Sequence, residues 1–437
     1  MPFEVYCVDF FTFVLLTFGM CKSTINIMKK NNTIYFILIV FYILFVLPIG
    51  IDILITFPSY STWNVFRNFE ISYNDPLTRV IYDIWTIISF MIMYMVGLNF
   101  KINSKWNVLK PVCKNDSCIN KGINNKWILT IFFTLGIMPI IIVLIFKLPT
   151  DILYTMFWLD NGLYEFTGRT QVIYYTLQRA TFFCIPCCFM YFVNAPKKNK
   201  VRKLIMLISI YSLICLESKR AILAVVGVMI ISYLIYNTKF KNRKYVMSLG
   251  LTILIVLLIF SLGYMVEHRV YNIDYSFINT YTQIKMDFMR DDRVKAVIYS
   301  ILNPSKMNIL DYPFQSYITQ ISSIFPLEFL FANKLIGYNT YFTCAMLELP
   351  ISTGLNWMTT SFFDEMIANF NVIGMFLGPY IIGKICLISD KYSSKLKVIS
   401  IIGILLLMML SLNYIMWYVQ IWFLILILER YKIVIHK

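Results

Sequence analysis

The residues of this sequence that could carry chemistry are charged side chains placed within long apolar stretches or at their ends. Arg179 lies well inside one stretch, while Glu217 and Arg220 fall between two others. A charge at membrane depth costs at least a few kcal/mol, so such residues usually line a pathway or a site. Arginine suits phosphate groups, because its planar fork donates two parallel hydrogen bonds. Arg179 and Arg220 are therefore predicted to bind phosphate; pairing of Arg179 with Asp52 or Asp83 is the structural alternative.

A second group of polar residues lies beside the apolar stretches. His268 and Arg269 follow one apolar run, and Asp364 and Glu365 begin another. Glu217, His268, Asp364 and Glu365 are candidate general bases, which take a proton from a reacting hydroxyl group. Carboxylates at the start of a helix also have a structural explanation, because they interact favourably with the helix dipole. Arg269 is a candidate anion contact.

Two further arginines, Arg290 and Arg293, belong to the segment 281–303, whose periodicity predicts a helix. On a helical projection both arginines share the apolar stripe. An arginine on an apolar face is predicted to point into a cavity or toward lipid headgroups. Salt bridges to Asp287 and Asp291 are the structural alternative.

Motifs for metal or nucleotide chemistry are absent from the sequence. It contains no Asp-x-Asp pair, no phosphate-binding loop of the form GxxxxGK(S/T) and no HExxH, and it has only two histidines. The ten cysteines have no zinc-site spacing with histidine and are interpreted as packing residues. We therefore expect no metal and no cofactor, and neither ATP-driven transport nor zinc proteolysis.

Composition identifies the chain as an integral membrane protein. Of the 437 residues, 59% are hydrophobic and 14% are charged, whereas about a quarter are charged in a soluble domain. The mean hydropathy is +0.69. These values exclude a soluble enzyme, a disordered chain and a secreted disulfide scaffold. The net charge of +16 is concentrated in short loops, where it sets membrane topology, and it does not indicate nucleic-acid binding.

The predicted fold is all-α and polytopic, because a helix needs about 20 apolar residues to cross the hydrocarbon core. Eleven apolar runs are predicted to be spans, some of them shorter than this length. They lie at 5–21, 34–57, 80–99, 127–146, 172–194, 204–217, 221–236, 245–265, 361–383, 398–412 and 414–429.

Basic residues determine the expected orientation. Most of the Lys and Arg residues, and few acids, fall in the segments 22–33, 100–126, 195–203, 237–244, 384–397 and 430–437. These segments are predicted to be cytoplasmic, with the N-terminus outside and the C-terminus inside.

This topology divides the chain into spans within 1–265, a large external loop at 266–360, and spans within 361–437. Structureless loops of such length are rare and usually functional. The loop is rich in Tyr and Phe and is expected to carry an amphipathic helix near 281–303.

Under this orientation the intramembrane charges, Asp9, Asp52 and Asp83 among them, fall in the outer halves of their spans. We therefore expect a polar cavity that opens outward above an apolar plug. A transporter needs polar groups through the midplane, so this distribution favours chemistry at the outer leaflet.

Two blocks of sequence resemble bacterial oligosaccharide repeat-unit polymerases, the Wzy-type O-antigen and capsule polymerases. The first block, L-I-C-L-E-S-K-R-A-I-L-A-V at 213–225, is similar to their S-x-R-(G/A) turn. The second block, T-S-F-F-D-E-M-I-A-N-F-N-V-I-G-M-F-L-G-P-Y-I-I-G at 360–383, is similar to their E-x-x-x-N-F-G-x-x-G pattern. Matching residues in the second block are Glu365, Asn369, Phe370 and Gly374. Asn371 departs from the pattern, because the family usually has glycine there.

The resemblance implies a membrane-embedded, GT-C-like glycosyltransferase that is independent of metal. It would join undecaprenyl-pyrophosphate-linked oligosaccharides at the outer leaflet of the bacterial cytoplasmic (inner) membrane. The resemblance also implies that Asn369 contacts substrate, together with the five arginines, and that a chain-length regulator is a partner.

Two alternatives remain. An O-antigen ligase shares the architecture and transfers glycan to lipid A core. A flippase for lipid-linked oligosaccharides would have a dozen or more spans and no large external loop.

Overall fold

The described part of the chain belongs to a single compact unit. The chain divides into two such units, and the first comprises residues 1–110, 231–392 and 401–416. Within it, the computed structural model describes residues 2–29, 32–54, 67–98, 281, 285, 289–318, 336–355, 358–390, 405, 408 and 409. Apart from the last three positions, the predicted spans at 127–146, 172–194, 204–217, 221–236, 245–265, 398–412 and 414–429 lie outside these residues.

Helices account for the regular structure of the described residues, which include no strand. In chain order they are α1 (Phe3–Lys29), α2 (Thr33–Phe41), the π-helical turn η1 (Tyr42–Val46), α3 (Leu47–Leu54), α4 (Arg67–Asn74), α5 (Pro76–Gly97), α12 (Asp291–Leu302), α14 (Tyr338–Leu347), the 3-10 turn η9 (Ile351–Thr353) and α15 (Phe362–Asp390).

Four of the predicted spans are confirmed as helices long and apolar enough to cross a membrane. They are Phe3–Ile27, Thr33–Ile53, Pro76–Gly97 and Phe362–Asp390. Two of the helices extend beyond the apolar runs that predicted them: α1 continues to Lys29 and α15 to Asp390. This difference arises because the helical hydrogen-bond ladder does not require apolar side chains. The protein is therefore a helical membrane protein.

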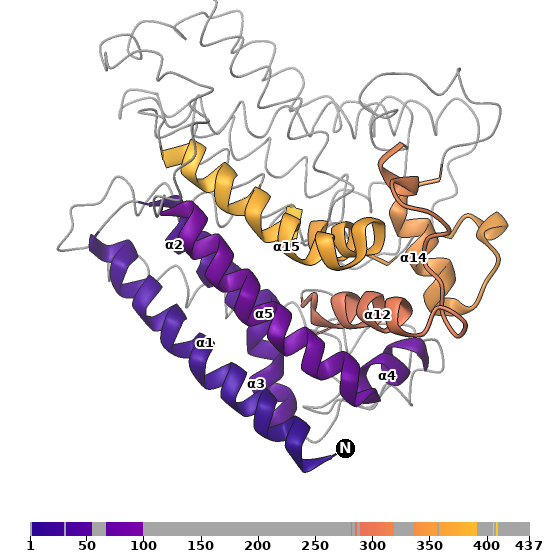
Figure 1. Cartoon of the computed structure of the whole chain (residues 1–437), viewed down its shortest axis with the longest axis horizontal. Coiled ribbons are helices and arrows are strands. Elements are labelled where there is room, and N and C mark those ends of the chain that lie inside the picture. The colour runs from indigo at the N-terminus through magenta and orange to yellow at the C-terminus, as the bar shows by residue number, and fades with distance from the viewer. Residues whose placement is uncertain are drawn as a thin grey trace, which may run out of the picture. The chain divides into compact units, whose positions relative to one another are not determined.

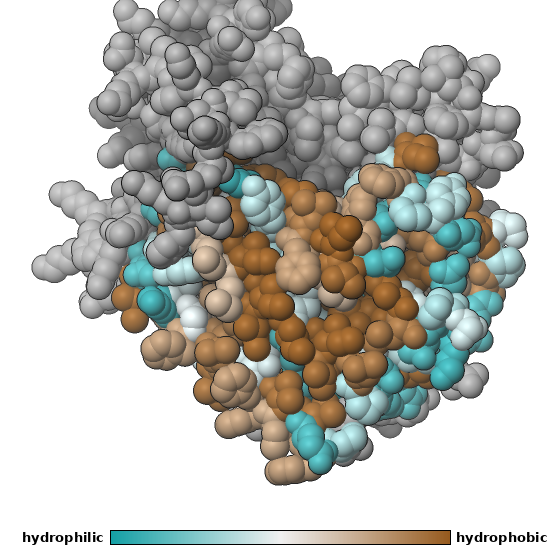
Figure 2. Space-filling model, viewed as in Figure 1, coloured by the Kyte–Doolittle hydropathy of each residue, from teal (hydrophilic) through white to brown (hydrophobic). Residues whose placement is uncertain are grey.

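The four spanning stretches pack around α5. This helix contacts α15, α1 and α2, and Figure 1 shows α2, α5 and α15 running side by side. Phe41, Phe45, Trp85 and Phe363 meet between them with ring centroids 5.0–5.9 Å apart. We call these four residues the aromatic cluster. Hydrophobic residues gather over α5 and α15 in Figure 2, and hydrophilic residues gather toward α4 and α14.

The two ends of this bundle differ. At one end, Thr33 at the start of α2 donates two hydrogen bonds to Asp390 Oδ1 at the end of α15, from its amide (2.8 Å) and from its hydroxyl (2.6 Å). These residues come from two segments predicted to lie on the same side of the membrane. At the other end, Asp9 of α1 pairs with Arg79 of α5, and α12 contacts α4, α5 and α15. The predicted external segment thus packs on the end of the bundle that carries the charges.

The predicted helix over 281–303 is interrupted. Residues 281 and 285 are helical, Met289 and Arg290 are not, and α12 begins only at Asp291. The amide of Arg290 donates instead to the carbonyl of Leu44, at 3.1 Å. Leu44 lies in the π-helical turn η1, and such turns release carbonyls from the usual ladder. The break therefore docks the segment on the second span, and Arg290 does not continue the helical stripe of Arg293.

The helix α15 is broken at Asn371, whose φ of 50° and ψ of −129° are not helical. A Cβ on Gly374 would overlap the carbonyl of Met366. The backbones of the two halves of α15 therefore approach so closely after the break that only glycine fits at 374. Two positions of the motif that carries the family resemblance, 371 and 374, thus make the break.

Candidate functional site

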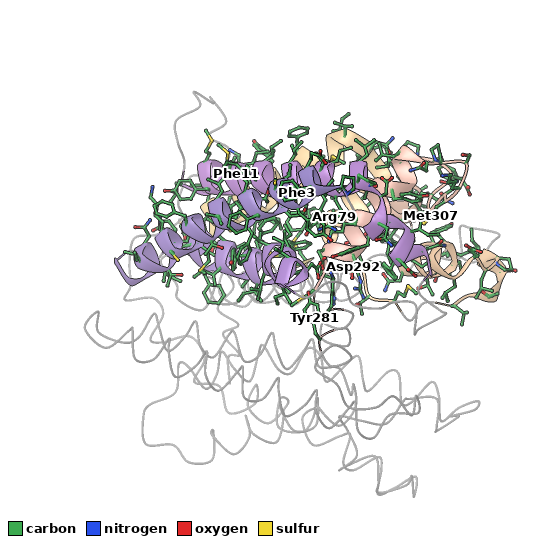
Figure 3. The ribbon with its side chains drawn as sticks, turned by 90° about the horizontal axis from the view of Figure 1, so that it is seen from below. Phe3, Phe11, Arg79, Tyr281, Asp292 and Met307 are labelled. Carbon is green, nitrogen blue, oxygen red and sulfur yellow. The ribbon has the colours of Figure 1, made fainter. Side chains whose placement is uncertain are left out.

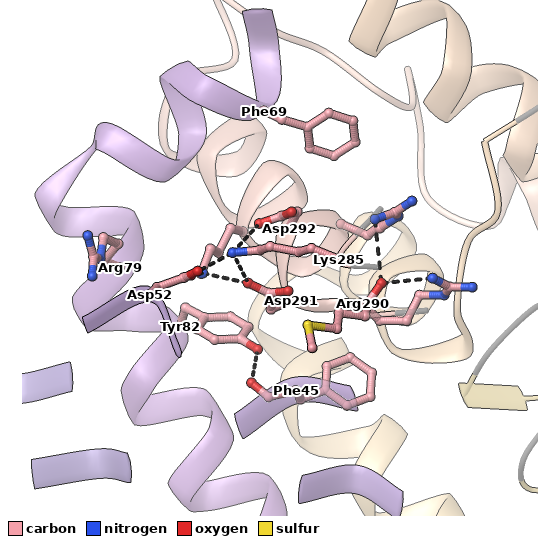
Figure 4. A network of polar contacts seen from close by, with 12 residues as sticks. Phe45, Asp52, Phe69, Arg79, Tyr82, Lys285, Arg290, Asp291 and Asp292 are labelled. Carbon is pink, nitrogen blue, oxygen red and sulfur yellow. Dashed lines mark hydrogen bonds and ion pairs between the residues drawn. The ribbon is translucent and has the colours of Figure 1, made fainter. Parts of the chain in front are cut away.

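Five charged residues are packed together where the external segment meets the spans. We call Asp52, Lys285, Asp291, Asp292 and Lys295 the charged cluster. The Lys285 ammonium lies 2.5 Å from Asp52 Oδ2, 3.1 Å from Asp291 Oδ2 and 3.4 Å from Asp292 Oδ1. Lys295 lies 2.8 Å from Asp291 Oδ2. All five side chains are buried, and Figure 4 shows Lys285 at their centre.

Burial and pairing shift the acidities within the charged cluster. Burial alone would lower the pKa of Lys285, but the facing carboxylates raise it well above its usual range. Burial would raise the pKa of Asp291, but Lys285 and Lys295 hold it below its usual range. Burial, reinforced by the charge of Asp291, raises the pKa of Asp292 to about 6. Lys285 therefore serves as the shared cation of three carboxylates.

Tyrosines enclose the charged cluster. Tyr281 donates to Asp52 Oδ1 at 2.8 Å, and the ammonium of Lys285 lies 4.9 Å from the ring centroid of Tyr73. Lys295 lies over the rings of Tyr73 and Tyr82, at 4.8 and 4.9 Å. Aromatic faces stabilise cations removed from water. The cluster thus sets three carboxylates against two lysines, with aromatic rings beside both cations.

A second network joins the family-like motif of α15 to the external segment. The hydroxyl of Ser316 donates to Glu365 Oε1 at 2.5 Å. The side-chain amide of Asn369 donates to Ser316 Oγ and to the carbonyl of Glu365, both at 2.9 Å. Because the amide nitrogen of Asn369 can only donate, the Ser316 hydroxyl accepts from Asn369 and donates its own hydrogen to Glu365. The three buried side chains thus form one directed chain of hydrogen bonds.

Asp364 has a different set of partners. Its Oδ1 accepts from the amide of Ser361 at 2.7 Å and from the Ser361 hydroxyl, while its own amide points back to Ser361 Oγ at 3.5 Å. This reciprocal pairing over three residues is a capping box at the start of α15. The contacts therefore favour the structural explanation of Asp364 over a role as base.

Two of the predicted substrate-binding arginines, Arg290 and Arg293, lie within the described residues. Arg290 donates from Nη1 to the carbonyl of Met289 at 2.7 Å, and Arg293 donates from Nε to the carbonyl of Thr359 at 3.4 Å. Both side chains are buried, and Arg290 lies within electrostatic range of Asp364. Asp291, the alternative salt-bridge partner of these arginines, forms ion pairs with Lys285 and Lys295. The predicted orientation of these arginines toward a cavity or lipid headgroups stays a prediction, and Asp287, their other alternative partner, lies outside the described residues.

Five other candidates, Arg179, Glu217, Arg220, His268 and Arg269, lie outside the described residues, and their roles stay predictions. Asp52 and Asp83, the proposed partners of Arg179, are both buried at the charged end. There Asp52 bonds to Tyr281 and Lys285. Figure 3 shows Arg79 and Asp292 among the packed helices of the same region.

Sequence reasoning missed Ser316 and Lys285. Neither residue matches the family-like motif, and both act through partners far along the chain, at Glu365 and Asp52. A lone serine gives no signal of such pairing in the sequence. Lys285 carried a weak signal, since a lysine in an apolar helical stripe requires a buried partner. No group of metal-ligating side chains occurs among the residues that the structure describes.

Comparison of the chain with models of protein families, with curated proteins and with solved structures gave no match.

Proposed function

We propose that this membrane protein is a glycosyltransferase that joins lipid-pyrophosphate-linked oligosaccharide repeat units at the outer leaflet. The observation that carries the proposal is the network around Ser316. Glu365 and Asn369, the polar residues of the family-like motif, converge on one hydroxyl from the predicted external segment. A buried carboxylate needs hydrogen-bond partners in any role, so the support lies in the convergence of both motif residues on one hydroxyl of the predicted external segment.

Glu365 is the proposed general base. A base must be oriented by a further group and held within reach of the proton that it takes. Ser316 and Asn369 supply that orientation. Asp364, the neighbouring candidate, is already engaged in the capping box. Of the two carboxylates, Glu365 therefore has the better geometry for catalysis.

The arginines are proposed to stabilise the leaving group. In the reaction, a hydroxyl oxygen of the acceptor sugar attacks the anomeric carbon of the donor glycan. The bond from that carbon to the lipid pyrophosphate breaks, the pyrophosphate leaves with the electron pair, and the base takes the hydroxyl proton. Cations fixed beside the pyrophosphate stabilise the transition state more than the ground state. Arg290 and Arg293 are the described candidates, and Arg179 and Arg220 complete the proposed set.

Deletion of the gene followed by gel analysis of surface polysaccharide tests the proposed function. A polymerase mutant leaves a single repeat unit attached to its final acceptor. Complete loss of attached glycan would favour the ligase instead. Polysaccharide of unchanged amount and length would contradict both.

A pair of matched variants tests the proposed base. Glu365→Gln should lower the rate of elongation by roughly 10²- to 10⁴-fold, the usual contribution of a general base, without lowering the amount of folded protein. Asp364→Asn should instead lower stability by about 1 kcal/mol, as loss of a cap does, and should still elongate glycan. The reverse result would move the base to Asp364.

A further inference from the structure

The segment 312–318, which follows the exposed Asp311 and ends in a helical turn at 315–318, has its polar and apolar sides reversed relative to an ordinary surface segment. Tyr312, Phe314 and Ile318 are exposed, whereas Gln315 and Ser316 are buried. Gln315 Oε1 accepts from the amides of Asp311 and Tyr312, at 2.8 and 3.4 Å. A surface segment in water normally turns its polar side chains outward. The reversed pattern indicates that the exposed side of this segment does not face water.

The backbone conformation and the exposure of Phe314 support the same conclusion. Its φ is 66°, a left-handed value that costs a bulky side chain about 1–2 kcal/mol. Its side chain is nevertheless 57% exposed, so an aqueous surrounding would add the cost of an uncovered aromatic ring. Strain of this kind persists where it serves a function. Insertion of the ring into an apolar medium would offset both costs.

The exposed side of the segment is continuous with the outer face of a spanning helix. The ring of Phe314 meets the ring of Phe370 edge to face, with centroids 4.7 Å apart. Just beyond Phe370, the exposed residues Val372 (59%) and Ile373 (69%) begin an apolar face of α15. α15 is long and apolar enough to cross a membrane, so this face contacts lipid. The patch around Phe314 therefore extends a lipid-contacting surface.

We infer that segment 312–318 inserts Tyr312, Phe314 and Ile318 into the interfacial layer of the lipid bilayer. Aromatic side chains are enriched at that depth, where an apolar ring and a polar hydroxyl both find suitable surroundings. The segment's polar side stays directed at Glu365 through Ser316. The insertion does not depend on the proposed catalytic activity.

Insertion of this segment has a consequence for the proposed function and, in that respect, rests on it. Ser316 follows Phe314 by two residues, so the anchored ring would hold the Ser316–Glu365 pair close to the lipid headgroups. The phosphate groups of a lipid-linked substrate lie at that depth. The segment would therefore align the base with the substrate along the membrane normal.

Site-directed spin labelling tests the insertion directly. The native cysteines are replaced, single cysteines are introduced as Phe314→Cys and Tyr312→Cys, and each carries a nitroxide label. Ile373→Cys on the lipid-contacting face of α15 and Lys306→Cys in an exposed turn serve as references. The protein is placed in vesicles of phosphatidylethanolamine and phosphatidylglycerol. Collision of the label with oxygen, which concentrates in lipid, is compared with collision with a water-soluble nickel chelate.

Labels at 314 and 312 should collide preferentially with oxygen, as the label at 373 should, and the label at 306 should favour the nickel chelate. Preference for nickel at both 312 and 314 would overturn the inference by showing that the segment faces water. Low collision with both reagents at these positions would also overturn it, because protein would then cover the patch. Oxygen preference at 312 and 314, together with failure of the native protein to elongate lipid-linked glycan, would count against the proposed function alone.

Discussion

The aromatic cluster and the charged cluster are both buried and both include residues of the second span, yet they are assembled differently. The second span contributes Phe45 to one cluster and Asp52 to the other, about two helical turns away. The aromatic cluster is complete with residues of the spans alone. The charged cluster takes four of its five members from the external segment. The spans can therefore form an apolar layer alone, whereas the buried charge of Asp52 is neutralised by a distant part of the chain.

Hydrogen bonds and ring contacts also join the aromatic cluster to the charged cluster. Tyr82 of α5 donates to the carbonyl of Phe45 at 2.6 Å, and its ring faces the ammonium of Lys295. That carbonyl belongs to the π-helical turn η1, whose Leu44 carbonyl accepts from Arg290. The irregular turn thus supplies acceptors to both Tyr82 and Arg290. Apolar packing is sufficient to stabilise the aromatic cluster, whereas the charged cluster depends on specific ion-pair partners.

The largest expected effect comes from removing the shared cation. Lys285→Met keeps a long side chain but leaves Asp52, Asp291 and Asp292 without it. Breaking a buried ion pair on one side costs about 3–5 kcal/mol. Phe363→Leu in the aromatic cluster should cost roughly 1.5 kcal/mol or less, as hydrophobic exchanges of similar volume do. Thermal unfolding of the purified proteins in detergent compares the two variants.

Partial rescue provides the control for this difference. Lys285→Met combined with Asp52→Asn removes one uncompensated charge and should recover part of the lost stability, because the two residues share one network. Equal destabilisation by Lys285→Met and Phe363→Leu would contradict the contrast between the two clusters.

The next effect concerns the break that brings the motif of α15 to the external segment. Gly374→Ala places a Cβ against the carbonyl of Met366, so the two halves of α15 must separate. Overpacking of this kind costs about 1–3 kcal/mol. The separation should also weaken the contact of Glu365 with Ser316, while the charged cluster on α12 keeps its partners. Loss of elongation activity with a moderate fall in unfolding temperature would support this; an unchanged activity would separate the break from the site.

Much of the described fold could be predicted from hydropathy, because crossing a bilayer requires long apolar runs. The four confirmed spans follow from that requirement, and the gathering of Asp9, Asp52 and Asp83 at one end agrees with the predicted depth of these charges. Periodicity could not predict the break before Asp291. That break depends on a carbonyl of a π-helical turn more than two hundred residues earlier, and no local pattern encodes such a contact.

The candidate site was predictable only in part. Glu365 and Asn369 could be named because they match a family-like motif. Arg290 and Arg293 could be named because they fall on a predicted apolar stripe, although the break before Asp291 interrupts that stripe. The distinction between Asp364 and Glu365 required structure, because adjacent carboxylates at a helix start look alike in sequence. Their hydrogen-bond partners separate a cap from a candidate base.

A smaller effect is expected from pH, through Asp292. Its pKa in the folded protein is about 6, above its ordinary value of 3.8, so protonation favours folding. Stability should rise as the pH falls from about 7 toward 4, and it is lost as the pH rises through about 6. Below about 4 the lowered pKa of Asp291 acts in the opposite direction. Asp292→Asn mimics the protonated carboxyl and should stabilise the protein at pH 8 by roughly 1–2 kcal/mol.

Unfolding temperatures measured across pH 4 to 8 check this prediction. The variant should show a shallower slope than the parent protein between roughly pH 4 and 6 and should match the parent near the acid end of that window. A variant that is less stable than the parent at pH 8 would mean that the ionised Asp292 is a favourable partner of Lys285. All three carboxylates of the charged cluster, instead of two, would then be stabilised in their ionised form.

The smallest expected effect comes from Asn371, where the sequence departs from the glycine of the resembling family. Its φ and ψ, 50° and −129°, match the first central position of a type II′ turn, which favours glycine because other residues are strained there. Asn371→Gly relieves that strain but gives the unfolded chain more freedom, which costs about 0.5–1 kcal/mol. The net gain should therefore be about 1 kcal/mol or less, whereas Asn371→Ala should lose about 1 kcal/mol. If both variants lowered the unfolding temperature equally, the asparagine side chain itself would hold the break, and the backbone explanation for the family's glycine would fail in this chain.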